Sequence, residues 1–189
     1  MNLITWDIKA FEFINFDLSN PFFDYILPFM REPLFWIPLY IFLIAFVFFN
    51  YGKKGYWFII FLILTASTAD MISSRAIKKS IKRIRPCNTE YIDVVQRVHC
   101  GSGYSFTSSH AANHFAVASF IVLTLGQSFK KIIPFCWFWA AIISFSQVYV
   151  GVHYPLDVLC GAIVGILVGR IWSFLFNRYY AGTLETQFT

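Results

Sequence analysis

Five long apolar segments constrain this chain more than any other feature of its sequence. They cover approximately residues 33–49, 56–69, 109–125, 132–150 and 155–176, with polar turns or loops between them. Blocks of about 18 or more predominantly apolar residues are typical of helices that cross a lipid bilayer. Only 13% of the residues are charged, whereas a soluble domain has about 25%. We therefore predict an all-α, polytopic membrane helix bundle with about five transmembrane helices.

The segments before and after the bundle are more polar. Residues 1–32 mix aromatic with charged side chains, and an Asn-Pro dipeptide divides them in two. This pattern predicts two amphipathic helices in the membrane interface, with a single tilted span as the alternative. We expect one membrane-embedded domain over residues 1–189, in which residues 33–177 form the bundle and residues 178–189 form a polar tail.

The basic residues of the turns predict the orientation in the membrane. Five of them fall on one side of a five-span bundle: Lys53, Lys54, Lys130, Lys131 and Arg178. Turns rich in Lys and Arg usually face the cytoplasm. The polar stretches that carry the candidate chemistry then lie on the opposite, outer side.

A second basic cluster lies in that predicted outer region. Seven of the fifteen Lys and Arg residues fall between positions 75 and 97. Because this cluster is joined directly to membrane segments, we expect an anionic lipid as the partner and no nucleic acid. Cys87 and Cys100 lie in the same region. In an oxidising compartment they can form a disulfide, and two free thiols are the alternative.

Within the cluster, one predicted helical face carries a stripe of cations. Lys78, Lys82 and Arg85 are spaced four and three residues apart, which places them on that face. Arg75 falls on it too, and Pro86 is expected to end the helix. Such a stripe supplies the charge and the guanidinium forks that bind phosphate oxygens. The alternative is a basic patch that anchors the protein to anionic lipid.

Two serines and a histidine precede the third apolar segment. Ser108 and Ser109 suit a helix N-cap, where unpaired backbone N–H groups and the positive helix end bind anions. His110, in the first turn, would lie beside such an anion and could give a proton to a leaving oxygen. The alternative is an ordinary N-cap with an interfacial histidine.

A histidine and a carboxylate stand one helical turn apart at the start of the last apolar segment. At this spacing the side chains of His153 and Asp157 can meet. A carboxylate that accepts one imidazole N–H fixes the tautomer and leaves the other nitrogen available as a base or nucleophile. We interpret the three stretches together as one phosphate-handling site at a membrane surface.

The three stretches resemble the motifs of the type 2 phosphatidic acid phosphatase superfamily, which are KxxxxxxRP, PSGH and SRxxxxxHxxxD. Residues 78–86 match the first motif completely. Residues 107–110 read TSSH, so the serine and histidine match but the proline and glycine do not. Residues 146–157 read SQVYVGVHYPLD, with Gln147 where the family usually has arginine.

The resemblance implies a metal-independent phosphatase without a cofactor. It implies that His153 attacks phosphorus to form a phosphohistidine, that Asp157 holds His153, and that His110 protonates the leaving oxygen. The implied phosphate-binding residues are Lys78, Arg85, Ser108, Ser109 and Gln147. Glutamine brings no positive charge, so either another cation substitutes or turnover is slow. The candidates are Arg75, Lys82 and Arg97.

The implied substrate is an anionic lipid phosphate or diphosphate whose tail stays in the bilayer. The chain resembles short bacterial undecaprenyl diphosphate phosphatases, so undecaprenyl diphosphate is our first expectation. Phosphatidylglycerophosphate, phosphatidic acid and lipid A phosphate are the alternatives. The expected location is a bacterial inner (cytoplasmic) membrane, crossed several times, with the active site facing the periplasm or the outside. A non-catalytic anionic-lipid-binding protein on the same scaffold is the alternative class, and no obligate protein partner is evident.

Overall fold

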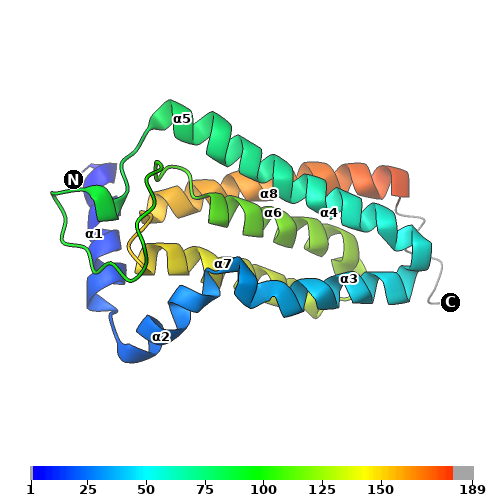
Figure 1. The fold of residues 1–189 in the computed structure, drawn as a ribbon. Helices are drawn as coiled ribbons and strands as arrows, with labels where there is room; N and C mark the ends of the chain where they lie inside the picture. The colour runs from blue at the N-terminus through cyan, green and yellow to red at the C-terminus, as the bar shows by residue number, and fades with distance from the viewer. Residues whose placement is uncertain (1, 181–189) are drawn as a thin grey trace.

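The computed structural model describes residues 2–180, whose regular structure is helical throughout. Five helices run side by side along a bundle (Figure 1). They are α3 (Ile37–Tyr51), α4 (Gly55–Asp70), α6 (Ser109–Thr124), α7 (Ile132–Tyr149) and α8 (Pro155–Tyr180). Four segments are long and apolar enough to cross a membrane, and they are Pro33–Tyr51, Gly55–Asn88, Ile132–Tyr149 and Pro155–Tyr180. The predicted all-α membrane bundle is therefore confirmed.

The remaining predicted span, α6, is shorter than these four. It has 16 residues, which makes it about 24 Å long at a rise of about 1.5 Å per residue. It packs against α4, α7 and α8. Most of its surface therefore meets other helices, and the residues at its start lie among their ends.

Three glycines bring α8 into backbone contact with α6. Gly161, Gly165 and Gly169 recur every four residues and face α6. A β-carbon added at Gly165 would lie 2.3 Å from the carbonyl oxygen of Ala112, so no larger residue fits without moving the helices apart. In membranes, small residues allow this close approach, which packing then stabilises. The contact fixes the start of α8 beside the start of α6.

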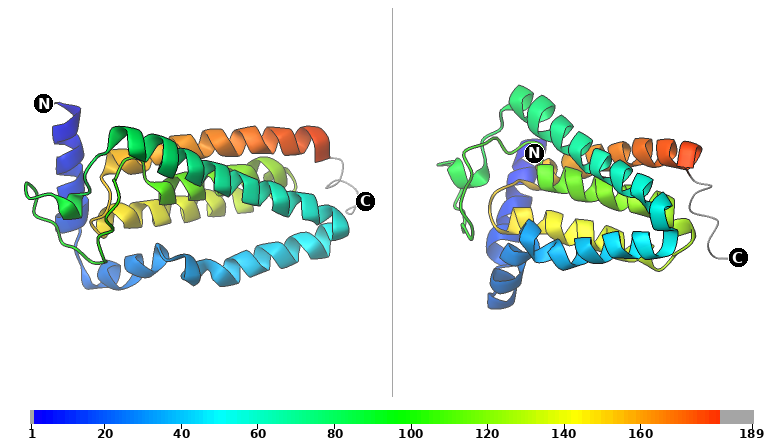
Figure 2. Two further views of the ribbon diagram at one scale, coloured as in Figure 1. Left: turned by 45° about the horizontal axis from the view of Figure 1, so that its top comes forward. Right: turned by 45° about the vertical axis from the view of Figure 1, so that its right-hand side comes forward.

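The N-terminal segment forms two helices that lie across one end of the bundle (Figures 1 and 2). Helix α1 (Leu3–Glu12) begins at an Asn2 cap and continues as a π turn, and α2 (Pro21–Met30) begins at an Asn20 cap. Helix α1 contacts α8, and α2 contacts α7. The two helices predicted for residues 1–32 are present, and they cover the end at which α6 and α8 begin.

The predicted basic helical face ends early. Helix α4 continues through a π-helical stretch (Met71–Ile77) into α5 (Lys78–Ile81). Lys82 then adopts a left-handed conformation with φ of 53°, and the chain leaves the helix. The prediction that Pro86 ends this helix is therefore wrong. Lys82 and Arg85 do not share a helical face with Lys78.

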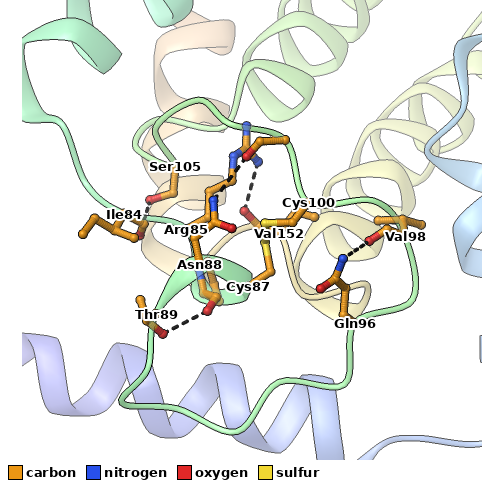
Figure 3. The surroundings of a disulfide bond; sticks show 12 residues. Ile84, Arg85, Cys87, Asn88, Thr89, Gln96, Val98, Cys100, Ser105 and Val152 are labelled. Atoms are coloured by element: carbon orange, nitrogen blue, oxygen red, sulfur yellow. Dashed lines mark hydrogen bonds between the residues drawn. A yellow bond between two sulfur atoms is a disulfide. The ribbon is translucent and has the colours of Figure 1, made fainter.

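A disulfide closes the loop between α5 and α6. Cys87 and Cys100 are bonded, with their Cα atoms 6.0 Å apart (Figure 3). Arg85 lies beside this bond and donates a hydrogen bond to the carbonyl oxygen of Val152, which precedes α8 (Figure 3). The loop is thus held against the start of the last helix.

The last helix extends further than the sequence suggested. Helix α8 ends at Tyr180, so residues 178–180 of the predicted polar tail are helical. The rest of that tail lies outside the described residues.

Substituting Gly165 by alanine should destabilise the bundle. The added methyl group meets backbone of α6, and overpacking of this kind costs about 1–3 kcal/mol. We expect a lower melting temperature in detergent for Gly165→Ala. Gly101→Ala is the matched control, since a β-carbon at Gly101 meets nothing within 4 Å. Equal melting temperatures for the two variants would contradict the close-contact explanation.

Candidate active site

The three predicted stretches meet at the end of the bundle that α1 and α2 cover. The backbone N–H of Ser108, just before α6, donates to the carbonyl oxygen of Asp157 in α8 at 2.9 Å. Arg85 reaches the same place from the disulfide loop, where its Nη1–H donates to the carbonyl oxygen of Val152 at 3.1 Å. The stretches are therefore parts of one site.

His153 lies between a carboxylate and a guanidinium. Its side chain is 2% exposed, with Nδ1 3.6 Å from Oδ2 of Asp157 and Nε2 3.4 Å from Nη1 of Arg85. The first separation exceeds a hydrogen-bond length, and Nδ1 has no hydrogen-bond partner among residues 2–180. Burial lowers the pKa of His153 to about 4, although Asp157 acts in the opposite direction. The imidazole is therefore neutral at physiological pH.

Asp157 is buried and is held mainly by Arg83, which the sequence analysis did not assign to the site. The Nη1–H of Arg83 donates to Oδ1 of Asp157 at 2.8 Å, and the backbone N–H of Tyr154 donates to Oδ2 at 2.9 Å. The guanidinium also lies 3.8 Å from the centre of the Tyr154 ring. One oxygen of Asp157 thus faces Arg83, and the other is shared between the Tyr154 backbone and the side of His153.

A second carboxylate holds Arg83 from the N-terminal helix. Asp7, in α1, is buried and accepts from Nη2 of Arg83 at 2.6 Å. Its other oxygen accepts from the backbone N–H of Leu156 at 2.8 Å. Asp7 therefore fixes both Arg83 and the first turn of α8, and α1 becomes a supporting part of the site.

The start of α6 is surrounded by hydroxyl groups. Ser108 caps the helix, accepting from the backbone N–H of Ala111 at 3.4 Å. The hydroxyl of Ser109 lies 3.1 Å from that of Ser73 and 2.9 Å from that of Ser74, both in the π-helical stretch. Thr107 lies 3.0 Å from Ser73 in the same cluster. Thr107 and Ser109, the two departures from the PSGH pattern, thus both contact the π-helical stretch that continues α4.

His110 lies in the first turn of α6, half-buried. The Nδ1 of His114 lies 2.8 Å from the carbonyl oxygen of His110, and their rings are nearly parallel. His153 and Lys78 both act electrostatically on His110, which places the three groups in one neighbourhood. Lys78 is half-buried at the start of α5 and acts on His153 as well.

Gln147 occupies the position of the family arginine at the end of α7. Its backbone carbonyl accepts from the N–H groups of Val152 and His153 at 3.2 Å each, which shapes the turn before α8. Its side chain is fully buried, and neither amide atom has a partner in the part of the chain that the structure describes. A buried amide without partners costs about 1–3 kcal/mol, so a bound ligand is the natural partner for it.

Two of the three cations expected to compensate for Gln147 point elsewhere. Arg97 forms an ion pair with Asp24 and lies over the ring of Tyr149, which ties the disulfide loop to α2 and α7. Lys82 is exposed at the left-handed residue after α5. Arg75 is also exposed, in a hollow lined by α4, its π-helical continuation and Asn113 of α6. Lys82 thus follows the early end of the helix, and Arg97 is already paired with Asp24, so neither contact supports a role in place of the family arginine.

This arrangement is suited to phosphoryl transfer. A neutral imidazole beside a carboxylate is a nucleophile, and a second histidine can carry a proton. The cations Lys78 and Arg85, with the N–H groups at the start of α6, can stabilise negative oxygens. The sequence analysis missed Arg83 because a helix continuing to Pro86 would place Arg83 on a different face from Lys78, Lys82 and Arg85. Its place inside the Lys78–Pro86 motif was a signal for it.

Comparisons with known proteins agree with this chemistry. The chain matches the PAP2 superfamily over residues 55–180. It is 29% identical over 180 residues to a lipid A 4'-phosphatase of Bacteroides thetaiotaomicron. This alignment covers 93% of this chain and 79% of that protein. The structure of Aquifex aeolicus LpxE, 27% identical, aligns with a TM-score of 0.67 over 87% of this chain and 92% of that one. A transmembrane PAP2-type phosphatidylglycerolphosphate phosphatase from Bacillus subtilis, 23% identical, shares the fold with a TM-score of 0.71 over 95% of this chain and 89% of that one.

Substituting Asp7 by asparagine should destabilise the protein. The change leaves the half-buried Arg83 with one carboxylate instead of two, and an under-satisfied buried group costs on the order of 1–3 kcal/mol. We expect a lower melting temperature in detergent for Asp7→Asn. Asp17→Asn is the matched control, because Asp17 is exposed in the same segment. Identical melting curves for both variants would show that the Asp7–Arg83 pair has no structural role.

Proposed function

We propose a substrate and a mechanism for this chain, which belongs to the PAP2 superfamily and is a membrane-embedded lipid phosphatase. In this proposal it hydrolyses a phosphate monoester of a lipid A-type glycolipid through a phosphohistidine at His153. The observation that carries the proposal is the position of His153, with one ring nitrogen facing Asp157 and the other facing Arg85. No metal takes part in the proposed reaction.

In the first step, Nε2 of His153 attacks phosphorus, and the bond from phosphorus to the lipid oxygen breaks. The leaving oxygen takes a proton from His110. Burial and the nearby cations favour a neutral His110 in the free site, so we propose that His110 becomes protonated when the phosphate dianion binds beside it. The phosphorylated ring keeps a proton on Nδ1, and the carboxylate of Asp157 stabilises the resulting positive charge. The 3.6 Å separation between Nδ1 and Oδ2 closes to a hydrogen bond in this state, as catalytic hydrogen bonds often do when substrate binds.

In the second step, water attacks the phosphorus of the phosphohistidine. His110, now neutral, takes a proton from this water, and the bond from phosphorus to Nε2 breaks. Inorganic phosphate leaves, and both histidines return to their starting states. His110 thus acts first as an acid and then as a base.

The phosphate oxygens need several donors around them. The proposed set is Lys78, Arg85, the hydroxyl of Ser108, the backbone N–H groups of Ser109 and His110, and the amide of Gln147. The unpartnered amide of Gln147 supports this assignment, because a phosphate oxygen would accept from its buried NH2 group. Removing one such oxyanion donor typically costs a factor of about 100–1,000 in rate.

An apolar cavity supports a substrate with a hydrocarbon tail. It has a volume of about 620 Å³ and lies between α3, α4, α6 and α7. Its wall is formed almost entirely by apolar side chains, and it reaches His114 and Asn113, one turn along α6 from His110. We propose that an acyl chain lies here while the phosphate is held at His153.

A polar hollow beside this cavity supports a sugar headgroup. It has a volume of about 510 Å³, shares Ala66 and Asn113 with the apolar cavity, and also includes Ser67, Asp70 and Arg75. These side chains can bind the hydroxyl and amide groups of an acylated amino sugar, which a prenyl diphosphate lacks. Together with the lipid A 4'-phosphatase relative, this hollow moves lipid A phosphate ahead of undecaprenyl diphosphate, our first expectation.

The arrangement of charges supports an outward-facing site. The turn between α3 and α4, the turn between α6 and α7, and the C-terminal end of α8 lie at the end of the bundle opposite α1 (Figure 1). By sequence, these segments contain Lys53, Lys130, Lys131 and Arg178. If these basic residues face the cytoplasm, the site lies on the outer side of the membrane. A disulfide at the site end agrees with an oxidising compartment. We propose the inner membrane of a bacterium, with the site facing the periplasm or the outside.

The first test is phosphate release by the purified protein in detergent with EDTA present. The lipid panel holds lipid A, undecaprenyl diphosphate, phosphatidylglycerophosphate and phosphatidic acid. We expect release from lipid A by the native protein and none by His153→Ala, because this variant lacks the nucleophile. His99→Ala is the control, since His99 is exposed in the disulfide loop.

Four results of this assay would contradict parts of the proposal. Activity in His153→Ala would remove the phosphohistidine, and loss of activity in EDTA with rescue by a divalent ion would remove the metal-free mechanism. Faster release from another lipid would overturn the substrate assignment alone. No release from any lipid would favour a lipid-binding protein.

Asp70 offers a test of the headgroup assignment. Substituting Asp70 by alanine removes an acceptor from the polar hollow, so we expect KM for lipid A to rise about 10-fold, the value of one hydrogen bond to a charged group. KM for phosphatidic acid should not change. Glu90→Ala, which removes an exposed acid from the disulfide loop, is the control. Equal effects of Asp70→Ala on both lipids would rule out a headgroup-specific role.

A further inference from the structure

The absence of the family arginine leaves the phosphate site short of one guanidinium. Gln147 stands in that place, fully buried and neutral. Lys78 and Arg85 remain, but Arg83 is neutralised by two carboxylates and Arg97 by one. We expect a phosphate dianion in a buried site to need more positive charge than Lys78 and Arg85 alone provide.

One arginine in the N-terminal segment lacks a strong partner. Arg31 follows the last residue of α2, and its side chain is only 16% exposed. Its Nε is buried and has no hydrogen-bond partner within residues 2–180. A carboxylate oxygen of Glu32 is 4.0 Å from Nη1, and the Glu32 side chain is 55% exposed, so this pair is weak. A buried guanidinium with unused donors indicates a missing anion.

A row of aromatic rings connects this arginine to the catalytic histidines. The indole N–H of Trp36 donates to the carbonyl oxygen of Met30 at 2.7 Å, which fixes the end of α2. The Trp36 ring centre is 6.0 Å from that of Trp139, and Trp139 is 4.8 Å from His114. His114 in turn lies against His110. The segment after α2 is therefore linked, through Trp36 and through Trp139 of α7, to His114 on α6.

The electrostatics agree with this position. Arg31 lies close enough to both His110 and Arg85 for its positive charge to act on them. Arg31 and Arg85 belong to two different segments, the end of α2 and the loop between α5 and α6. Like charges brought together in a partly buried place are typical of an anion-binding site.

We propose that Arg31 binds the substrate phosphate in the role that the family arginine would have at position 147. This inference rests on the proposed function. The guanidinium fork of Arg31 contacts one or two phosphate oxygens, completing a set with Lys78 and Arg85. The missing positive charge is thus supplied by a segment that lies before the first membrane helix.

The test is a swap between the two positions. Arg31→Ala should lower kcat/KM for the lipid phosphate by about 100-fold, the usual effect of losing one oxyanion donor. Gln147→Arg in the Arg31→Ala background should recover much of that loss, because it restores an arginine at the family position. Lys9→Ala is the matched control, since it removes an exposed cation from the same N-terminal segment. Arg31→Gln keeps a polar side chain without the charge, and gives a second measurement if Arg31→Ala melts at a lower temperature.

A binding measurement separates this inference from the proposed reaction. Inorganic phosphate should raise the melting temperature of the native protein and of Lys9→Ala, and should do so much less for Arg31→Ala and Arg31→Gln. Native activity and native phosphate stabilisation in both Arg31 variants, with His153→Ala inactive, would overturn the role of Arg31 alone. Activity in His153→Ala would overturn the proposed reaction, while the phosphate titration would still decide whether Arg31 binds the anion.

Discussion

The backbone contact between α6 and α8 is the constraint on which the site depends. Gly161, Gly165 and Gly169 let the two helices approach until only glycine fits. Three of the groups proposed to bind phosphate, the hydroxyl of Ser108 and the N–H groups of Ser109 and His110, lie at the start of α6. The nucleophile and its carboxylate lie at the start of α8. A fixed distance between the helices therefore fixes the distance between these two halves. In a bilayer, where apolar side chains gain little by leaving lipid, such close packing is a main source of helix association.

A network of charges completes the same end of the molecule. Arg83 joins Asp7 of α1 to Asp157 of α8, and Arg97 joins α2 to the disulfide loop. Both arginines also lie over tyrosine rings. These contacts make α1 and α2 part of the site rather than a separate membrane anchor. They also hold the carboxylate of Asp157 ionised beside a neutral His153, which is the state that the proposed attack requires.

The helices and the three motif stretches could be predicted because each is a local pattern. Apolar block length reveals a membrane helix, and spacing within a motif reveals which side chains share a turn. The roles of Arg83 and Asp7 could not be predicted in this way. They depend on a left-handed turn at Lys82 and on how α1 lies across the bundle, which are results of packing between distant segments. The glycine spacing of α8 was visible in the sequence, but its partner surface on α6 was not.

The N-terminal helices are synthesised first, but some of their contacts form only after the last helix has been made. Asp7 is synthesised 149 residues before Leu156, the backbone group that it binds in the finished fold. At about 5–20 residues per second, roughly 7–30 seconds pass before the start of α8 is made. During that interval Asp7 has no first turn of α8 to bind, and the nucleophile has not been made. The nascent protein therefore passes most of its synthesis as an incomplete bundle, and its earliest residues are among the last to reach their final partners.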